Sequence, residues 1–106
     1  MQALPSHRTI THFITNKHEL YPQSQTMDHH NKATGFERRL GAYVLENYRL
    51  ASFDLEEYGR ESQRMQADAL GEAYRGWRRL WHGPGREITS GALVWQVGSL
   101  YLNMVD

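Results

Sequence analysis

One stretch, residues 54–82, constrains the fold more than any other because it carries both the start and the stop of a long helix. Asp54 and Glu57 have the spacing of a capping box, in which each side chain accepts a hydrogen bond from an early backbone N–H. Residues 83–85, Gly-Pro-Gly, supply a C-terminal glycine and a proline that cannot continue the helix. The sequence therefore predicts a helix from about residue 54 to residue 82.

The apolar side chains of this stretch recur at three- and four-residue steps, which places them on one broad arc of a helix. The arc comprises Leu55, Tyr58, Met65, Ala69, Leu70, Ala73, Trp77, Leu80 and Trp81, and the opposite arc comprises Arg60, Arg64, Arg75, Arg78, Arg79 and His82. Phe53 and Tyr58 also have the spacing of a hydrophobic staple across the helix start. An arc this wide needs further elements to cover it.

A second helix is predicted over residues 35–50. Thr34 and Glu37 have capping-box spacing, and an apolar stripe follows them, formed by Phe36, Leu40, Tyr43, Val44 and Tyr48. This helix and the helix over residues 54–82 are expected to form an antiparallel hairpin.

The segment over residues 90–105 fits two structures. Ser90 can cap a helix whose apolar residues are Leu93, Val94, Val97, Leu100, Tyr101 and Met104. The same residues can form a β-hairpin that turns at Gly98-Ser99. The helix is favoured because its apolar spacing is regular and an isolated hairpin is marginally stable.

Residues 1–33 show no helical period and hold five of the six histidines, so they are expected to form a flexible polar arm. The run over residues 9–15 is rich in β-prone residues but has no partner strand. The spacing of His29-His30 matches no established zinc motif, so no metal site is predicted.

Composition excludes several classes of protein. The chain has no cysteine, which excludes disulfides, thiolate zinc sites and a cysteine nucleophile, and fits a reducing compartment. Its first residues lack the pattern of a secretory signal, so the protein is expected to be cytoplasmic. Its 12 basic and 12 acidic side chains balance, so no global field draws it to nucleic acid or membrane. No nucleophile elbow, P-loop or dinucleotide-binding glycine motif is present, which predicts a non-enzymatic protein without cofactor or metal.

These features predict an all-α fold, a small helical hairpin or three-helix bundle over residues 34–106 with an extended arm over residues 1–33. The function predicted is a small interaction or regulatory module that binds a protein partner or itself as a homodimer. Aromatic side chains anchor protein interfaces, and the candidate partner-binding residues are Tyr43, Tyr48, Trp77, Trp81, Trp95 and Tyr101.

An alternative function depends on the arginines near the end of the long helix. Arg75, Arg78, Arg79 and Arg86 could bind phosphates of RNA or DNA, because guanidinium groups match phosphate geometry. The same arginines and tryptophans could instead place the helix on a membrane surface. The simplest interpretation is that these charges complement the helix dipole and form local ion pairs with Glu72 and its neighbours.

The run over residues 60–70, followed by Tyr-Arg-Gly-Trp-Arg-Arg-Leu over residues 74–80, resembles the arginine-rich helix of small proteobacterial proteins of the DUF1127-like group. The resemblance covers under a quarter of the chain. It implies an RNA-linked regulatory role in a bacterial-type protein. The short Asp-Ile-Gly ending typical of that group is absent from this sequence.

Overall fold

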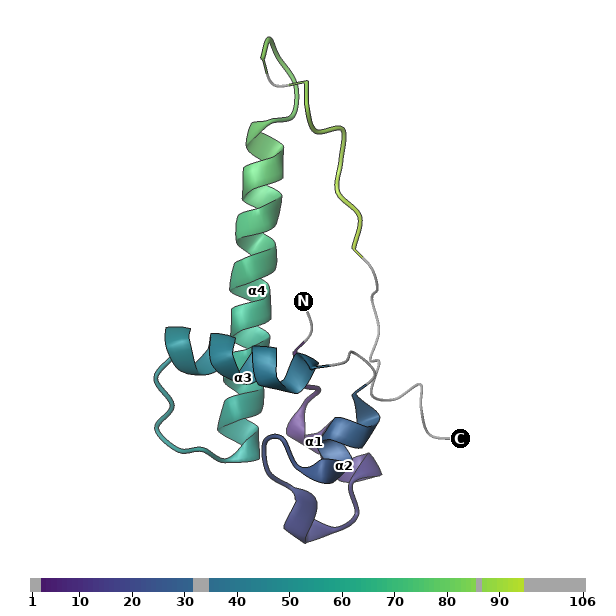
Figure 1. The fold of residues 1–106 in the computed structure, drawn as a ribbon. Helices are drawn as coiled ribbons and strands as arrows, with labels where there is room; N and C mark the ends of the chain where they lie inside the picture. Colours follow the sequence, from purple (N-terminus) through teal and green to yellow (C-terminus); the bar gives the residue numbers. More distant parts are fainter. Residues whose placement is uncertain (1–2, 32–34, 86, 95–106) are drawn as a thin grey trace.

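The chain folds as helices grouped around the start of one long helix. The computed structural model describes residues 3–31, 35–85 and 87–94, and within these ranges the fold is all-α, as predicted. The elements are α1 (His7–Phe13), the 3-10 turn η1 (Lys17–Glu19), α2 (Gln25–His30), α3 (Phe36–Asn47) and α4 (Leu55–Arg79). Figure 1 shows α3 crossing the lower half of α4, with α1 and α2 beside the same end.

The start of α4 confirms the predicted N-cap at Asp54, whereas the Glu57 carboxylate reaches past the cap to the loop before it. Asp54 Oδ1 accepts the backbone N–H of Glu57 at 2.8 Å. The Glu57 carboxylate accepts the N–H groups of Ala51 at 2.6 Å and Ser52 at 2.9 Å, so it ties down the loop before the cap. The predicted staple also forms, because the rings of Phe53 and Tyr58 lie 5.5 Å apart in an edge-on contact.

The end of α4 comes three residues before the predicted position. Its final backbone bonds run to the residue three positions back, from Leu80 N to Trp77 O at 3.0 Å and from Trp81 N to Arg78 O at 3.2 Å, which tightens the last turn. The backbone then turns with positive φ at His82 (64°), Gly83 (96°) and Gly85 (76°). Two of these positions are glycines, which adopt such angles without steric cost.

Helix α3 is shorter than the predicted range of 35–50. It ends because Tyr48 is extended, with φ −128° and ψ 144°. Gly35, with φ 70°, occupies the N-cap without a side-chain capping bond, and the predicted cap residue Thr34 lies outside the described residues.

The predicted C-terminal helix or hairpin over residues 90–105 is only partly covered by the structure. Residues 90–94 form neither a helix nor a strand, and residues 95–105 lie outside the described ranges.

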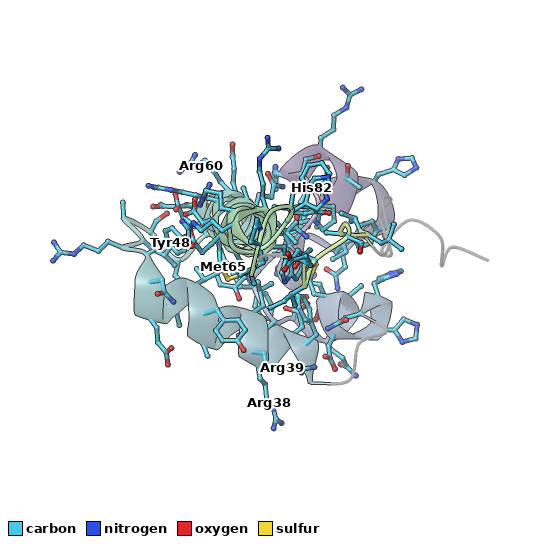
Figure 2. The ribbon with its side chains drawn as sticks, turned by 90° about the horizontal axis from the view of Figure 1, so that it is seen from above. Arg38, Arg39, Tyr48, Arg60, Met65 and His82 are labelled. Atoms are coloured by element: carbon cyan, nitrogen blue, oxygen red, sulfur yellow. The ribbon has the colours of Figure 1, made fainter. Side chains whose placement is uncertain are left out.

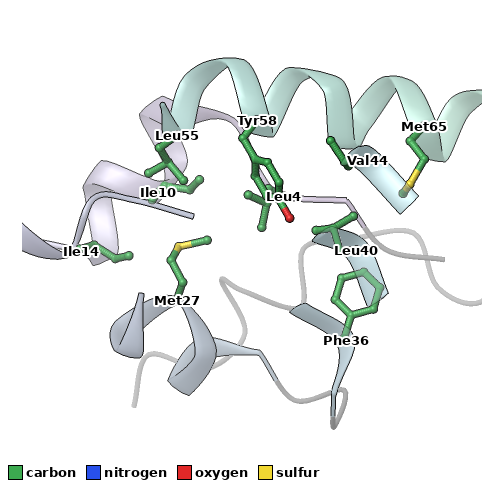
Figure 3. Close-up of a cluster of buried hydrophobic side chains, with 10 residues drawn as sticks. All are labelled: Leu4, Ile10, Ile14, Met27, Phe36, Leu40, Val44, Leu55, Tyr58 and Met65. Atoms are coloured by element: carbon green, nitrogen blue, oxygen red, sulfur yellow. The ribbon is translucent and has the colours of Figure 1, made fainter. Parts of the chain in front are cut away.

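The structure differs most from the predicted arm over residues 1–33. Leu4, Ile10, Ile14 and Met27 are buried in the same hydrophobic cluster as the residues from the long helices, which are Phe36, Leu40, Val44, Leu55, Tyr58 and Met65 (Figure 3). The β-prone run over residues 9–15 lies largely within α1. The first part of the chain therefore belongs to the core.

Two serine caps and one backbone clamp explain this difference. Ser6 and Ser24 cap α1 and α2, which have only seven and six residues, so neither helix is long enough to display an apolar period. The Leu4 N–H donates to Ser62 Oγ at 3.0 Å, and the Leu4 carbonyl accepts Gln63 Nε2 at 2.9 Å. These bonds fix the chain start against α4.

The Ile10→Ala substitution tests whether the first 31 residues belong to the core. Ile10 is fully buried, so its truncation should lower the free energy of unfolding by about 2–5 kcal/mol. The exposed neighbour His12, changed to alanine, is the control and should cost no more than about 0.5 kcal/mol. Urea unfolding followed by circular dichroism measures both, and equal small effects would contradict the assignment.

The cap of α4 also predicts a loss of stability in acid. The backbone N–H of Glu57, followed by the Ser52 hydroxyl, lowers the pKa of Asp54, and the Ala51 N–H and Ser52 lower the pKa of Glu57. Because both pKa values are lower in the folded state, the stabilisation is present above the ordinary carboxyl range near pH 4 and is lost as pH falls below it.

The paired variant Asp54→Asn, Glu57→Gln keeps hydrogen-bond acceptors at both positions but cannot titrate. Its melting temperature should fall less than that of the parent chain between about pH 5 and pH 2. Thermal unfolding followed by circular dichroism measures the two slopes, and identical slopes would show that the cap does not control acid stability.

Candidate functional site: an aromatic groove at the end of α4

A groove lies between the last turns of α4 and residues 89–92, which come after the end of that helix. It encloses about 280 Å³. We call it the aromatic groove, and its lining residues are Tyr74, Arg75, Trp77, Arg78, Trp81, Thr89, Gly91 and Ala92.

Backbone hydrogen bonds fix the far wall of the aromatic groove. Trp81 and Glu87 form an isolated antiparallel bridge, and Thr89 N donates to Leu80 O at 3.3 Å. Through these contacts, residues 87–89 lie beside Leu80 and Trp81 at the end of α4. Thr89 and the small residues after it are thereby held opposite the indoles.

Two aromatic rings of the groove contact each other, and its two tryptophans are half-exposed. The rings of Tyr74 and Trp77 contact edge to face, with centroids 5.6 Å apart and an interplanar angle of 75°. Trp77 and Trp81 remain 45% and 48% exposed. The groove therefore presents two large aromatic surfaces that the described part of the chain does not cover.

The structure brings together only two of the predicted partner-binding residues. Trp77 and Trp81 line the aromatic groove, whereas Tyr43 is exposed on α3 and is not among the lining residues. Trp95 and Tyr101 lie outside the described residues.

Tyr48 serves an internal contact instead. Its hydroxyl donates to Asp68 Oδ2 at 2.6 Å, and the Arg64 guanidinium lies 5.4 Å from its ring centre. The hydrogen bond to Asp68 is the main cause that raises the pKa of Tyr48. This tyrosine holds the chain after α3 against α4.

The predicted phosphate-binding arginines do not form a free cluster. Arg75 pairs with Glu72 at 3.2 Å and Arg79 approaches the same carboxylate at 3.9 Å, which matches the local ion pairs expected on a helix. Arg78 lines the aromatic groove, and Arg86 lies outside the described residues.

The lining of the groove combines aromatic, basic and small side chains. No carboxylate or histidine is among the described lining residues. Elsewhere in the described ranges, no three histidine, aspartate or glutamate side chains gather as metal ligands would. In the same ranges, no helix is both long and apolar enough to cross a membrane.

Sequence reasoning missed the second wall of the groove. Residues 89–92 carry small and hydroxyl side chains with no period, so no sequence pattern marks them. Tyr74 lies beside Trp77 on the α4 wall, as expected for helical residues three positions apart.

The known proteins that are similar to this chain include three fungal sequences, each named β-mannosidase B. The Thermothelomyces thermophilus protein is 46% identical over 104 residues, the Emericella nidulans protein 48% over 101 and the Aspergillus niger protein 46% over 101. Each match covers 95% of this chain but only 12% of the relative. No family model and no solved structure matches the chain.

These relatives correct several predictions from the sequence. The resemblance to proteobacterial arginine-rich proteins is wrong, because the strong similarity extends along nearly the whole chain and leads to fungal proteins. The arginine pattern over residues 60–80 is common to solvated helices, so it could not identify a family. The predicted non-enzymatic regulator, with its nucleic-acid and membrane alternatives, is also wrong, because the relatives are named as enzymes.

The Trp77→Ala substitution tests whether the groove is uncovered in the chain by itself. Trp77 is half-exposed, so its loss should lower the free energy of unfolding by about 1 kcal/mol or less. Tyr58→Ala, which removes a fully buried ring, should cost about 3–5 kcal/mol. Urea unfolding measures the free energy of unfolding of both variants. A loss for Trp77→Ala equal to that for Tyr58→Ala would show that Trp77 is covered in the chain by itself.

Proposed function

We propose that this chain is a segment of a β-mannosidase B-type glycosidase and supplies part of that enzyme's helical framework. One observation carries the proposal: identity of 46–48% extends over 95% of the chain. The chain spans about one eighth of the length of the relatives, since each match covers 12% of them. The proposed activity, hydrolysis of β-mannosides, is therefore assigned to the larger enzyme.

The carboxylates of the described residues support a framework role. Most glycosidases act through two carboxyl groups on either side of the scissile bond. Asp54 and Glu57 are held in the cap of α4, and Glu72 is held between two arginines. In the proposed enzyme, the reacting carboxylates come from outside these positions.

Among the described residues, Glu37 is the one carboxylate-bearing residue that is deeply buried. The residue is 4% exposed, on the first turn of α3. This position is enclosed by the core rather than open to a substrate. Its place supports a role in fixing α3, in keeping with a framework segment.

A segment exchange tests the proposal. The matched 101 residues of the Aspergillus niger β-mannosidase B are replaced by the corresponding residues of this chain. Hydrolysis of p-nitrophenyl β-mannoside should persist with kcat/KM within about tenfold of the parent enzyme, a change of about 1.4 kcal/mol in transition-state stabilisation.

Two controls bracket this result. The same enzyme without the segment should be inactive, and the exchanged enzyme carrying Tyr58→Asp should lose activity because it buries a charge in the core. An exchanged enzyme that folds but has no activity above the deletion would contradict the proposed function.

A further inference from the structure

Burial along α4 stops halfway, although its apolar arc does not. The buried residues of α4 are Leu55, Tyr58, Gly59, Ser62 and Met65, all in its first eleven positions. Figure 2, viewed along this helix, shows Met65 between α4 and α3 and Arg60 on the other side. Beyond Met65 the same arc carries Leu70, Trp77 and Leu80, and no described residue there is buried.

Seven of the eleven large apolar side chains that are exposed among the described residues lie in the second half of α4 or in the segment after it. They are Tyr74, Trp77, Leu80 and Trp81 on and just after α4, and Ile88, Leu93 and Val94 after the turn. Monomeric proteins rarely expose a large contiguous apolar patch unless it binds something. The radius of gyration, 16.5 Å, exceeds the roughly 13 Å of a compact domain of this length, and Figure 1 shows the upper half of α4 projecting beyond the other helices.

We propose that the aromatic groove, extended by residues 88–94, docks onto the remaining polypeptide of the β-mannosidase B-type enzyme. This inference rests on the proposed function. The relatives supply the reason for this occupant, because 88% of their length lies outside the matched segment. The polypeptide outside the matched segment would supply the surface that buries the aromatic groove and residues 88–94.

Charge at the groove narrows the chemistry of the occupant. Arg75 and Arg79 share the single carboxylate of Glu72, whereas the ion pairs among the described residues do not include Arg78. The docking surface should therefore present an apolar side chain that fills the space between the indoles and a carboxylate that meets Arg78. An ion pair between such a carboxylate and Arg78, at the edge of the interface, would fix the position of the docked surface more than it would add affinity.

A second copy of this chain fits the groove less well. In a two-fold dimer the same patch meets itself. Such a contact would bring together two basic helix ends, each containing Arg75, Arg78 and Arg79, and like charges brought together are unfavourable.

Oxidative footprinting tests the docking surface. Hydroxyl radicals label exposed side chains, and mass spectrometry then measures the oxidation rates of Trp77 and Trp81 in this chain alone and in the exchanged enzyme. Both rates should fall severalfold in the exchanged enzyme. Tyr21, which is 49% exposed and outside the groove, is the matched control and should lose less reactivity than either indole.

The outcomes separate this inference from the proposed function. An active exchanged enzyme whose indoles oxidise as fast as in the chain alone, or are protected no more than Tyr21, overturns the docking surface only. A folded enzyme with protected indoles and no activity overturns the proposed function only. Protection that grows with concentration in the chain alone identifies a second copy as the occupant and also overturns the inference.

A second experiment tests the docking surface if the exchanged enzyme does not fold. The intact chain is added to the segment-deleted enzyme, and the same oxidation rates are followed during titration. Saturable protection of Trp77 and Trp81, weakened by Arg78→Gln, supports docking. Unchanged rates at every concentration overturn it.

Discussion

The burial of Tyr58 near the start of α4 is the contact on which the rest of the fold depends. Its ring is fully buried, and this burial raises the pKa of its hydroxyl. A Cβ atom at Gly41 would lie 2.5 Å from Gln23 Nε2 and 3.5 Å from the Tyr58 hydroxyl. Glycine at this position therefore allows α3 to pack closely against the side chains of Gln23 and Tyr58. Gln23 Nε2 also donates to the Glu37 carbonyl at 3.4 Å, which joins the segment before α2 to α3.

This arrangement concentrates stability at one end of the molecule. The chain start is hydrogen-bonded to the third turn of α4, α3 packs across the same turns, and the core cluster lies between them (Figure 3). Beyond Asp68, the described contacts of α4 are local ion pairs and the contact between the Tyr74 and Trp77 rings, and exposed ion pairs contribute little. Helix α4 packs in the core at its first half and exposes apolar side chains at its second half, so the second half is suited to pack against a further part of a larger protein. The proposed role in a β-mannosidase B-type enzyme requires such a part, because the relatives are much longer than this chain.

The strongest local signals predicted the long elements well. The Asp54 cap, the Phe53–Tyr58 staple and the glycine-rich stop located α4 to within a few residues, because each signal satisfies or removes specific backbone groups. The short helices α1 and α2 were missed because six or seven residues cannot show a period, although Ser6 and Ser24 mark their starts.

The candidate site was only half predictable. Trp77 and Trp81 were identified from their arc on the helix, but the opposite wall depends on a turn with positive φ at His82, which no local preference indicates. The similarity to proteins named as enzymes could not be predicted from motifs, because this sequence contains no nucleophile elbow, P-loop or dinucleotide-binding glycine motif.

Hydrogen exchange along α4 tests the central claim most directly. Amide exchange is slow where opening requires the core to unfold and fast where a helix opens locally. In the chain alone, mass spectrometry should find strong protection over residues 58–65 and weak protection over residues 70–79. Uniform strong protection along the whole helix would contradict the claim that its second half lacks a partner within this chain.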